Sequence, residues 1–131
     1  MGRTFMTRTD TGVDVESLTP LHWIGILAAT VSGIVHVALG FLVGGALGIS
    51  FFFATLGFGA GVTAIVSGYR RRLVYALGIP FTAGQIVLWY VINFLFGTYS
   101  FPADVGVYGA VDKVAQVALI AVLAVLLSRE S

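Results

Sequence analysis

The sequence predicts an all-α, polytopic membrane protein, built as a bundle of four transmembrane helices. Of its 131 residues, 58% are hydrophobic and only 10% are charged, whereas a soluble domain carries about 25% charged residues. So few charges could not cover the surface of a water-soluble globule, and a lipid bilayer is therefore the expected surrounding. The charges are also grouped, and they leave long charge-free stretches between them. Helices are expected in these stretches, because a helix satisfies its own backbone hydrogen bonds in lipid.

The first charge-free stretch, residues 17–69, contains two of the four spans. It is long enough for two crossings, since each crossing takes about 20 residues. Gly44 and Gly45 supply the tight turn that two adjacent spans need. This predicts a first helix over 20–43 and a second over 46–69.

The start of the first helix carries its own signals. Thr19 can cap the helix, and Pro20 suits the first helical position, where no backbone donor is required. The preceding residues, 1–19, contain no apolar run and no cleavable signal sequence. We therefore expect a polar cytoplasmic tail over 1–19, followed by one transmembrane domain over 20–131.

The remaining two spans are predicted over 73–96 and 107–128. Pro80 lies inside the third helix and removes one backbone hydrogen bond there. We expect a kink at this point, with the Thr82 hydroxyl helping to satisfy the freed carbonyl groups.

A charged pair, Asp112-Lys113, constrains the fourth helix. The charge-free run after it, 114–128, has only 15 residues, which is too short to cross a bilayer that needs about 20. The pair must therefore lie within the span or at its headgroup edge. Adjacent residues point in different directions on a helix, so we expect Asp112 to face the bundle and Lys113 to reach toward the headgroups.

Basic residues predict the orientation in the membrane. With four spans, six of the seven Lys and Arg residues fall on one side: Arg3, Arg8, Arg70, Arg71, Arg72 and Arg129. The positive-inside rule makes that side cytoplasmic. We therefore expect a multi-pass protein of the plasma membrane with both termini in the cytoplasm.

The first helix has one face made of small or polar residues. These residues recur every three or four positions: His22, Gly25, Ala29, Ser32, His36 and Gly40. Small residues allow helices to approach closely in lipid, and such faces commonly form helix–helix contacts. The leading interpretation is a small, non-enzymatic membrane module that packs with itself or with a membrane-protein partner through such faces.

Polar side chains on three helices fall at similar depths in the half of the membrane away from the arginines. They are His36 on the first helix, Gln85 and Asn93 on the third, and Asp112 and Gln116 on the fourth. Polar groups are costly in lipid, so we expect them to face inward and to meet. They form either a structural hydrogen-bond network or a polar cavity that binds an ion, a proton or a solute. The second possibility would make the protein a small transporter or channel.

The two histidines suggest another alternative. His22 and His36 are fourteen residues apart on one helix face, a separation of about 21 Å. This spacing resembles that of haem-ligating histidines in membrane b-type cytochromes. Each level has one histidine only, so two haem b groups would require a symmetric dimer with the first helix at its axis. The alternative function is thus a dimeric, haem-binding electron carrier; otherwise no cofactor is expected.

Other chemistry has little support in the sequence. There is no cysteine, and the two histidines and Asp112 provide few ligands for a zinc ion. No nucleophile–base pattern or phosphate-binding loop is present, so we expect no catalytic residues, no metal site and no enzyme. The net charge of +1 is too small to suggest nucleic acid.

Several segments carry a resemblance to a known family. They are LTPLHWIG (18–25), GYRRRL (68–73), GIPFTAGQIVLWY (78–90) and VDKVAQV (111–117). In these segments the chain resembles a family of uncharacterised small four-helix membrane proteins of haloarchaea, over most of its length from Leu18 onward. The resemblance implies an archaeal plasma membrane, and it implies no activity.

Overall fold

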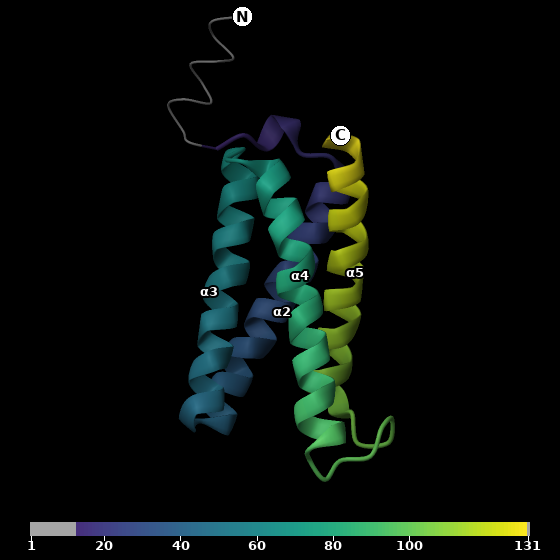
Figure 1. Cartoon of the computed structure of the whole chain (residues 1–131). Coiled ribbons are helices and arrows are strands. Elements are labelled where there is room, and N and C mark those ends of the chain that lie inside the picture. Colours follow the sequence, from purple (N-terminus) through teal and green to yellow (C-terminus); the bar gives the residue numbers. More distant parts are fainter. Residues whose placement is uncertain (1–12, 131) are drawn as a thin grey trace, which may run out of the picture.

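The computed structural model describes residues 13–130, and this part of the chain is helical throughout apart from its turns and loops (Figure 1). The four long helices are α2 (Pro20–Val43), α3 (Gly45–Ser67), α4 (Arg71–Tyr90) and α5 (Gly106–Glu130). A short 3-10 turn, η1 (Val15–Ser17), precedes α2, and a π-helix, η2 (Val91–Leu95), extends α4. All four spans are long and apolar enough to cross a membrane. Their ends lie within two residues of the predicted ones when η2 is counted as part of the third span, Arg71–Leu95.

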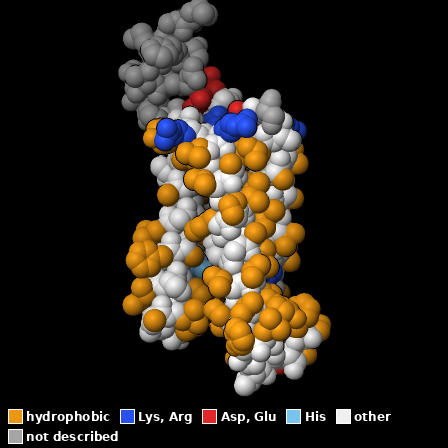
Figure 2. Space-filling view, in the orientation of Figure 1, with side chains coloured by type: hydrophobic (Ala, Val, Ile, Leu, Met, Phe, Trp, Pro, Cys, Tyr) orange, Lys and Arg blue, Asp and Glu red, His pale blue; other side chains and the backbone are white. Residues whose placement is uncertain are grey.

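The two ends of the bundle differ in character. The arginine end carries Arg70–Arg72 and Arg129, and Figure 2 shows the basic side chains gathered there. The loop end carries the α2–α3 turn and the loop 96–105. Figure 1 shows the C-terminus at the arginine end. The flanks between the two ends are largely hydrophobic in Figure 2.

Glycines make the turn and the close crossing between α2 and α3. Gly44 and Gly45 have φ angles of +68° and +64°, a region that only glycine adopts readily, which confirms the predicted turn. One turn further on, the two backbones touch. A Cβ atom built on Gly48 would lie 2.6 Å from the Gly40 carbonyl oxygen, too close for any other residue.

The four helices do not surround the bundle axis equally. α2 packs extensively against α3 and α5, and α5 packs extensively against α4, whereas α3 and α4 have much less contact. The bundle is therefore weakly closed along the α3–α4 seam. Figure 2 looks onto this seam, and a histidine side chain is visible within it.

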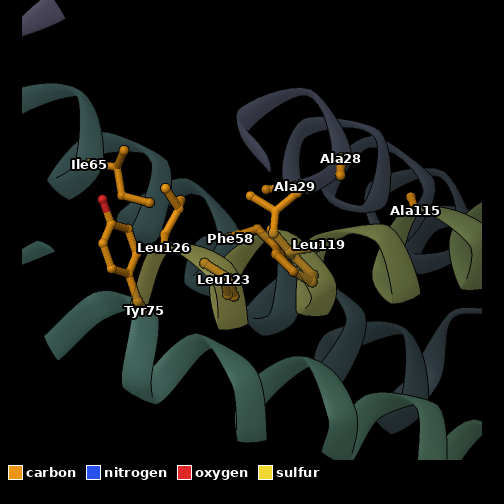
Figure 3. Packing of buried hydrophobic residues seen from close by; sticks show 10 residues of the cluster. Ala28, Ala29, Phe58, Ile65, Tyr75, Ala115, Leu119, Leu123 and Leu126 are labelled. Carbon is orange, nitrogen blue, oxygen red and sulfur yellow. The ribbon is translucent and has the colours of Figure 1, made fainter. Parts of the chain in front are cut away.

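The hydrophobic core fills mainly the arginine half of the bundle. Figure 3 shows Ile65, Tyr75 and Leu126 meeting from three helices, with Phe58, Leu119 and Leu123 continuing the cluster. The small-residue face of α2 packs against this core inside the same chain. At Gly25, for example, an added Cβ would lie 3.0 Å from the Val122 side chain of α5.

The segment before α2 is bound to the arginine end rather than extended away from it. The Asp14 N–H donates to the Val66 carbonyl oxygen (2.7 Å). The Arg71 guanidinium donates to the carbonyl oxygens of Ile65 (2.8 Å) and Asp14 (3.0 Å). Residues 1–12 of the predicted tail lie outside the described part of the chain.

The glycine crossing gives a direct test of the fold. Gly48→Ala should lower the free energy of unfolding by about 1–3 kcal/mol, because the added methyl group overpacks a backbone contact. Gly59→Ala is the matched control on the same helix, since a Cβ there meets nothing within 4 Å. Thermal unfolding in detergent would compare the two variants. Equal stability of both would contradict the close crossing.

Candidate functional site

Polar side chains from three helices meet in the loop-end half of the bundle. Lys113 Nζ donates to Asp112 Oδ2 (2.6 Å) and to Gln116 Oε1 (2.7 Å). Ser32 of α2 donates through its hydroxyl to the other oxygen of Asp112, Oδ1 (2.5 Å). The carboxylate is 3% exposed and thus depends on these donors in place of water.

The network continues from α5 to α4 through two amides. Gln116 is completely buried, and its Nε2 donates to Gln85 Oε1 (3.0 Å). Gln85 Nε2 in turn donates to the Phe81 carbonyl oxygen of its own helix (3.1 Å). These bonds link α5 to α4 at the same level at which Ser32 links it to α2.

His36 lies beside this network, and one of its ring nitrogens is hydrogen-bonded within α2. Its Nδ1 is 2.7 Å from the Ser32 carbonyl oxygen, which can only accept, so Nδ1 carries a hydrogen. The same nitrogen lies 3.7 Å from Asp112 Oδ1. The neutral ring therefore has its lone pair on Nε2, and no hydrogen bond among residues 13–130 involves that atom. The rings of Phe51 and Phe58 flank the imidazole, with centroids at 5.6 and 5.8 Å.

Ser32, His36 and Asp112 are the residue types of a hydrolytic triad, but their arrangement differs from one. In a triad the serine hydroxyl faces the lone pair of the histidine, and the carboxylate accepts from the opposite nitrogen. Here the Ser32 hydroxyl donates to Asp112, and the lone pair of His36 is on Nε2, away from it. The serine therefore has no general base in position.

Lys113 corrects one expectation from the sequence. It was predicted to reach toward the headgroups, yet its side chain is only 14% exposed. Its ammonium group lies 5.1 Å from the centre of the Trp89 ring, in addition to its bonds to Asp112 and Gln116. A carboxylate, an amide oxygen and an aromatic face together replace the water that the headgroup region would have provided.

The network borders a cavity of about 200 Å³ between all four helices. Its polar lining includes His36, Ser50, Gln85, Asn93, Asp112 and Lys113. Four of the five residues predicted for a polar cavity thus line it. The fifth, Gln116, lies behind the cavity in the hydrogen-bond network. Asn93 lines the cavity but stays outside the network, because its Nδ2 donates to the Trp89 carbonyl oxygen (2.9 Å).

A larger hollow of about 570 Å³ joins this cavity to the loop end. The two spaces share Trp89, Asn93 and Asp112 in their linings. The hollow continues along the loop residues 103–105 and the first turn of α5. We call it the vestibule. The two spaces are therefore adjacent, and Asp112 lines both of them.

The second histidine belongs to a separate polar group at the arginine end. His22 Nδ1 accepts a hydrogen bond from the Thr19 N–H (3.0 Å), the return half of a capping box, and His22 Nε2 lies 2.9 Å from the Tyr75 hydroxyl. Both ring nitrogens are thus engaged within the chain, and His36 is buried. Neither ring faces outward toward a second copy, an arrangement that disfavours the haem alternative.

Thr82 differs from the role expected for it. It is completely buried, and its hydroxyl makes no hydrogen bond with any described residue, so it does not satisfy carbonyls freed by Pro80. It lines an inner cavity of about 60 Å³ between the network and the arginine end, which His22 also lines. Buried hydroxyls normally have a partner, so this position calls for an explanation.

Sequence reasoning missed two members of the site. Ser32 was recognised only as part of the small face, although it lies one turn before His36, a spacing that places both side chains on one face. Lys113 was predicted to point outward, because nothing in the sequence indicates that Trp89 lies opposite it.

Within residues 13–130, no group of three His, Cys, Asp or Glu residues could hold a metal ion.

Comparison of the chain with protein-family models, with curated proteins and with solved structures finds no match. The fold and the site therefore define the class of protein by themselves. The protein is a four-helix bundle whose spans are long and apolar enough to cross a membrane, and a cavity lined by charged, hydrogen-bonded residues lies between these helices.

The buried pair predicts strong coupling between its two members. Asp112→Asn or Lys113→Met alone should lower the free energy of unfolding by about 3 kcal/mol, because each leaves a buried charge without its partner. The double variant should lose less than the sum of the two by about 1 kcal/mol or more. Denaturant unfolding in detergent micelles would measure all three. Additive losses would show that the two charges do not interact.

Proposed function

We propose that this protein is a small membrane transporter or channel that takes up a small ion or polar solute into the cavity beside Asp112. The observation that supports this proposal is the buried Asp112–Lys113 pair beside the cavity, with Asp112 also lining the vestibule toward the loop end. Ionisable residues inside transmembrane segments are costly, and they commonly mark the pathway of an ion, proton or substrate.

A purely structural network would account for the hydrogen bonds but not for the space beside them. The cavity has room for several water molecules, since one needs about 10–15 Å³ of such space. His36 and Asn93 border this space, and His36 Nε2 has no partner among residues 13–130. Polar groups that line a cavity and keep free bonding capacity are suited to a ligand that arrives hydrated.

We further propose that the arginine end is cytoplasmic and that the vestibule opens to the outside of the plasma membrane. The support is the concentration of basic residues at one end, which the positive-inside rule assigns to the cytoplasm. Both termini would then be cytoplasmic. The resemblance to small haloarchaeal membrane proteins supports an archaeal plasma membrane.

Transport by the purified protein would test the proposal. The protein is reconstituted in liposomes, and fluxes of protons, sodium, potassium, chloride and uncharged solutes such as glycerol are recorded. At least one flux should exceed that of protein-free liposomes. Asp112→Asn should reduce it by about tenfold, the effect of losing about 1.4 kcal/mol of interaction with the transported species. Glu16→Gln, at an exposed position near the arginine end, is the control. Absence of every flux would contradict the proposal.

A second candidate retains the packing module, with a second copy of this chain as the partner. The supporting observation is a shallow groove of about 600 Å³ between α2 and α3, lined by Gly33, Gly59, Thr30 and Thr63 among others. The two threonines donate to carbonyl oxygens of their own helices, so they leave the groove open to a closely approaching helix.

The groove predicts a specific effect on association. Gly59→Leu should convert a dimer to a monomer, because its side chain would extend into the groove from a position where an added Cβ meets nothing within 4 Å. Val87→Leu, on the exposed face of α4, should leave the dimer intact. The mass of the protein in detergent, measured by light scattering, distinguishes the outcomes. A wild-type monomer would exclude this candidate.

A further inference from the structure

Polar side chains follow the bundle axis from one end to the other, with one interruption. At the loop-end side are His36 and Asp112 in the outer cavity. Thr82 and His22 line the inner cavity of about 60 Å³. Beyond it, His22 is bonded to Tyr75 and to Thr19 at the arginine end. The polar side chains along the axis thus include one histidine toward each end of the bundle, and the two histidines are about 21 Å apart along α2.

The interruption consists of two aromatic rings. Phe58 lies with its ring centroid 5.8 Å from that of His36 and 5.2 Å from that of Phe81. Both phenylalanines also line the inner cavity. Phe81 packs tightly over Gly57, where an added Cβ would lie 2.4 Å from the ring. The two rings therefore separate the outer cavity from the inner one.

Thr82 lies at this boundary. It is one helical turn from Gln85, a rise of about 4.5 Å along α4, and Gln85 borders the outer cavity. Its hydroxyl has no partner within residues 13–130, and Thr82 lines a cavity that is otherwise almost entirely apolar. The inner cavity has room for a few water molecules, which the Thr82 hydroxyl could bind.

We infer that the transported species is a proton, and that it passes from His36 beside Asp112, by way of the Thr82 hydroxyl and the inner cavity, to His22. This inference rests on the proposed transport function and names its substrate. The inner cavity favours a proton over a metal cation or an anion, because such ions need many ligands to replace their hydration shell. The cavity offers one hydroxyl and one imidazole, together with apolar side chains.

Each transfer conserves the proton. At His36 the arriving proton binds the lone pair of Nε2 and later leaves from the same nitrogen to a water molecule, while Nδ1–H remains hydrogen-bonded to the Ser32 carbonyl oxygen. The resulting positive charge faces Asp112 Oδ1 at 3.7 Å. At Thr82 the hydroxyl oxygen accepts one proton from a neighbouring water and passes its own hydrogen to the next. At His22 the arriving proton replaces the Thr19 N–H on the lone pair of Nδ1, and the hydrogen of Nε2 leaves to the Tyr75 hydroxyl oxygen.

The charged and titratable surroundings of the two histidines differ. Around His36, α5 supplies Asp112 and Lys113, and α4 supplies Gln85. α3 supplies Ser50 and the aromatic rings of Phe51 and Phe58, none of them charged. Around His22, α4 supplies Tyr75, and the nearest charges are Arg71, Arg129 and Glu130. α3 faces His22 across the inner cavity with apolar side chains such as Val62 and Ile65. The histidine at the loop-end side thus lies beside an ion pair, and the one at the arginine end lies beside a hydroxyl and more distant charges.

Proton flux in liposomes tests the inference. Full-length protein is reconstituted with a pH-sensitive dye inside, and flux is driven by a potassium diffusion potential. Thr82→Val should lower the flux about tenfold or more, the usual scale of losing a positioned proton-transfer group. Thr82→Ser keeps the hydroxyl and should retain flux near the wild-type rate. Thr82→Val removes no hydrogen bond to the chain, so the bundle should stay folded, which its unfolding temperature would check.

A second variant tests the aromatic interruption. Phe81→Ala shortens a side chain that is 40% exposed, and it should raise proton flux several-fold by opening the boundary between the cavities. Unchanged flux in Thr82→Val, with folded protein, would overturn the inference. So would a wild-type protein that carries sodium, chloride or glycerol but no protons, a result that leaves the proposed transport function standing. Absence of all fluxes would overturn both.

Discussion

Two opposite charges lie inside the loop-end half of this bundle, and the arrangement of the other polar groups follows from their burial. Charge is costly away from water unless it is paired and hydrogen-bonded. Asp112 and Lys113 pair with each other at 2.6 Å, and each then requires further partners. Ser32 comes from α2, Gln116 from α5 and the ring of Trp89 from α4. The register of three helices is thus fixed by the needs of one ion pair.

The arginine half is stabilised mainly by apolar packing rather than by charge pairing. Apolar side chains fill it, and the small residues of α2 let α5 approach closely. Its polar group, His22 with Tyr75 and Thr19, is compact and satisfied within the chain. Phe58 and Phe81 separate the two halves. The protein therefore has a charged half with hollows toward the loop end, and a largely apolar half toward the arginine end.

The sequence predicted the fold well, because the signals for it are local. Charge spacing gives the spans, and Gly44-Gly45 gives the turn with the positive φ angles that the structure has. Helical periodicity and depth also placed His36, Gln85, Asn93 and Asp112 around one space. These inferences need only the pitch of a helix and the cost of polar groups in lipid.

The positions of Lys113, Thr82 and the small face of α2 depend on which helices are neighbours. A single sequence does not reveal which helices contact each other. Lys113 turned inward because Trp89 and Gln116 lie within reach of it. Thr82 was expected to bond freed carbonyls, yet it faces the inner cavity without a partner. The small face of α2 was expected to form helix–helix contacts, and the structure shows that most of it packs on α3 and α5 of the same chain.

The central claim is that water from the loop end reaches the cavity beside Asp112. The chain has no cysteine, so single-cysteine variants in liposomes can be treated with a charged, membrane-impermeant thiol reagent. Asn93→Cys lies where the vestibule meets the cavity, whereas Val87→Cys lies on the exposed flank of the same helix. We predict rapid modification of Asn93→Cys and little of Val87→Cys, which would face lipid. Equal protection of both positions would contradict an open cavity.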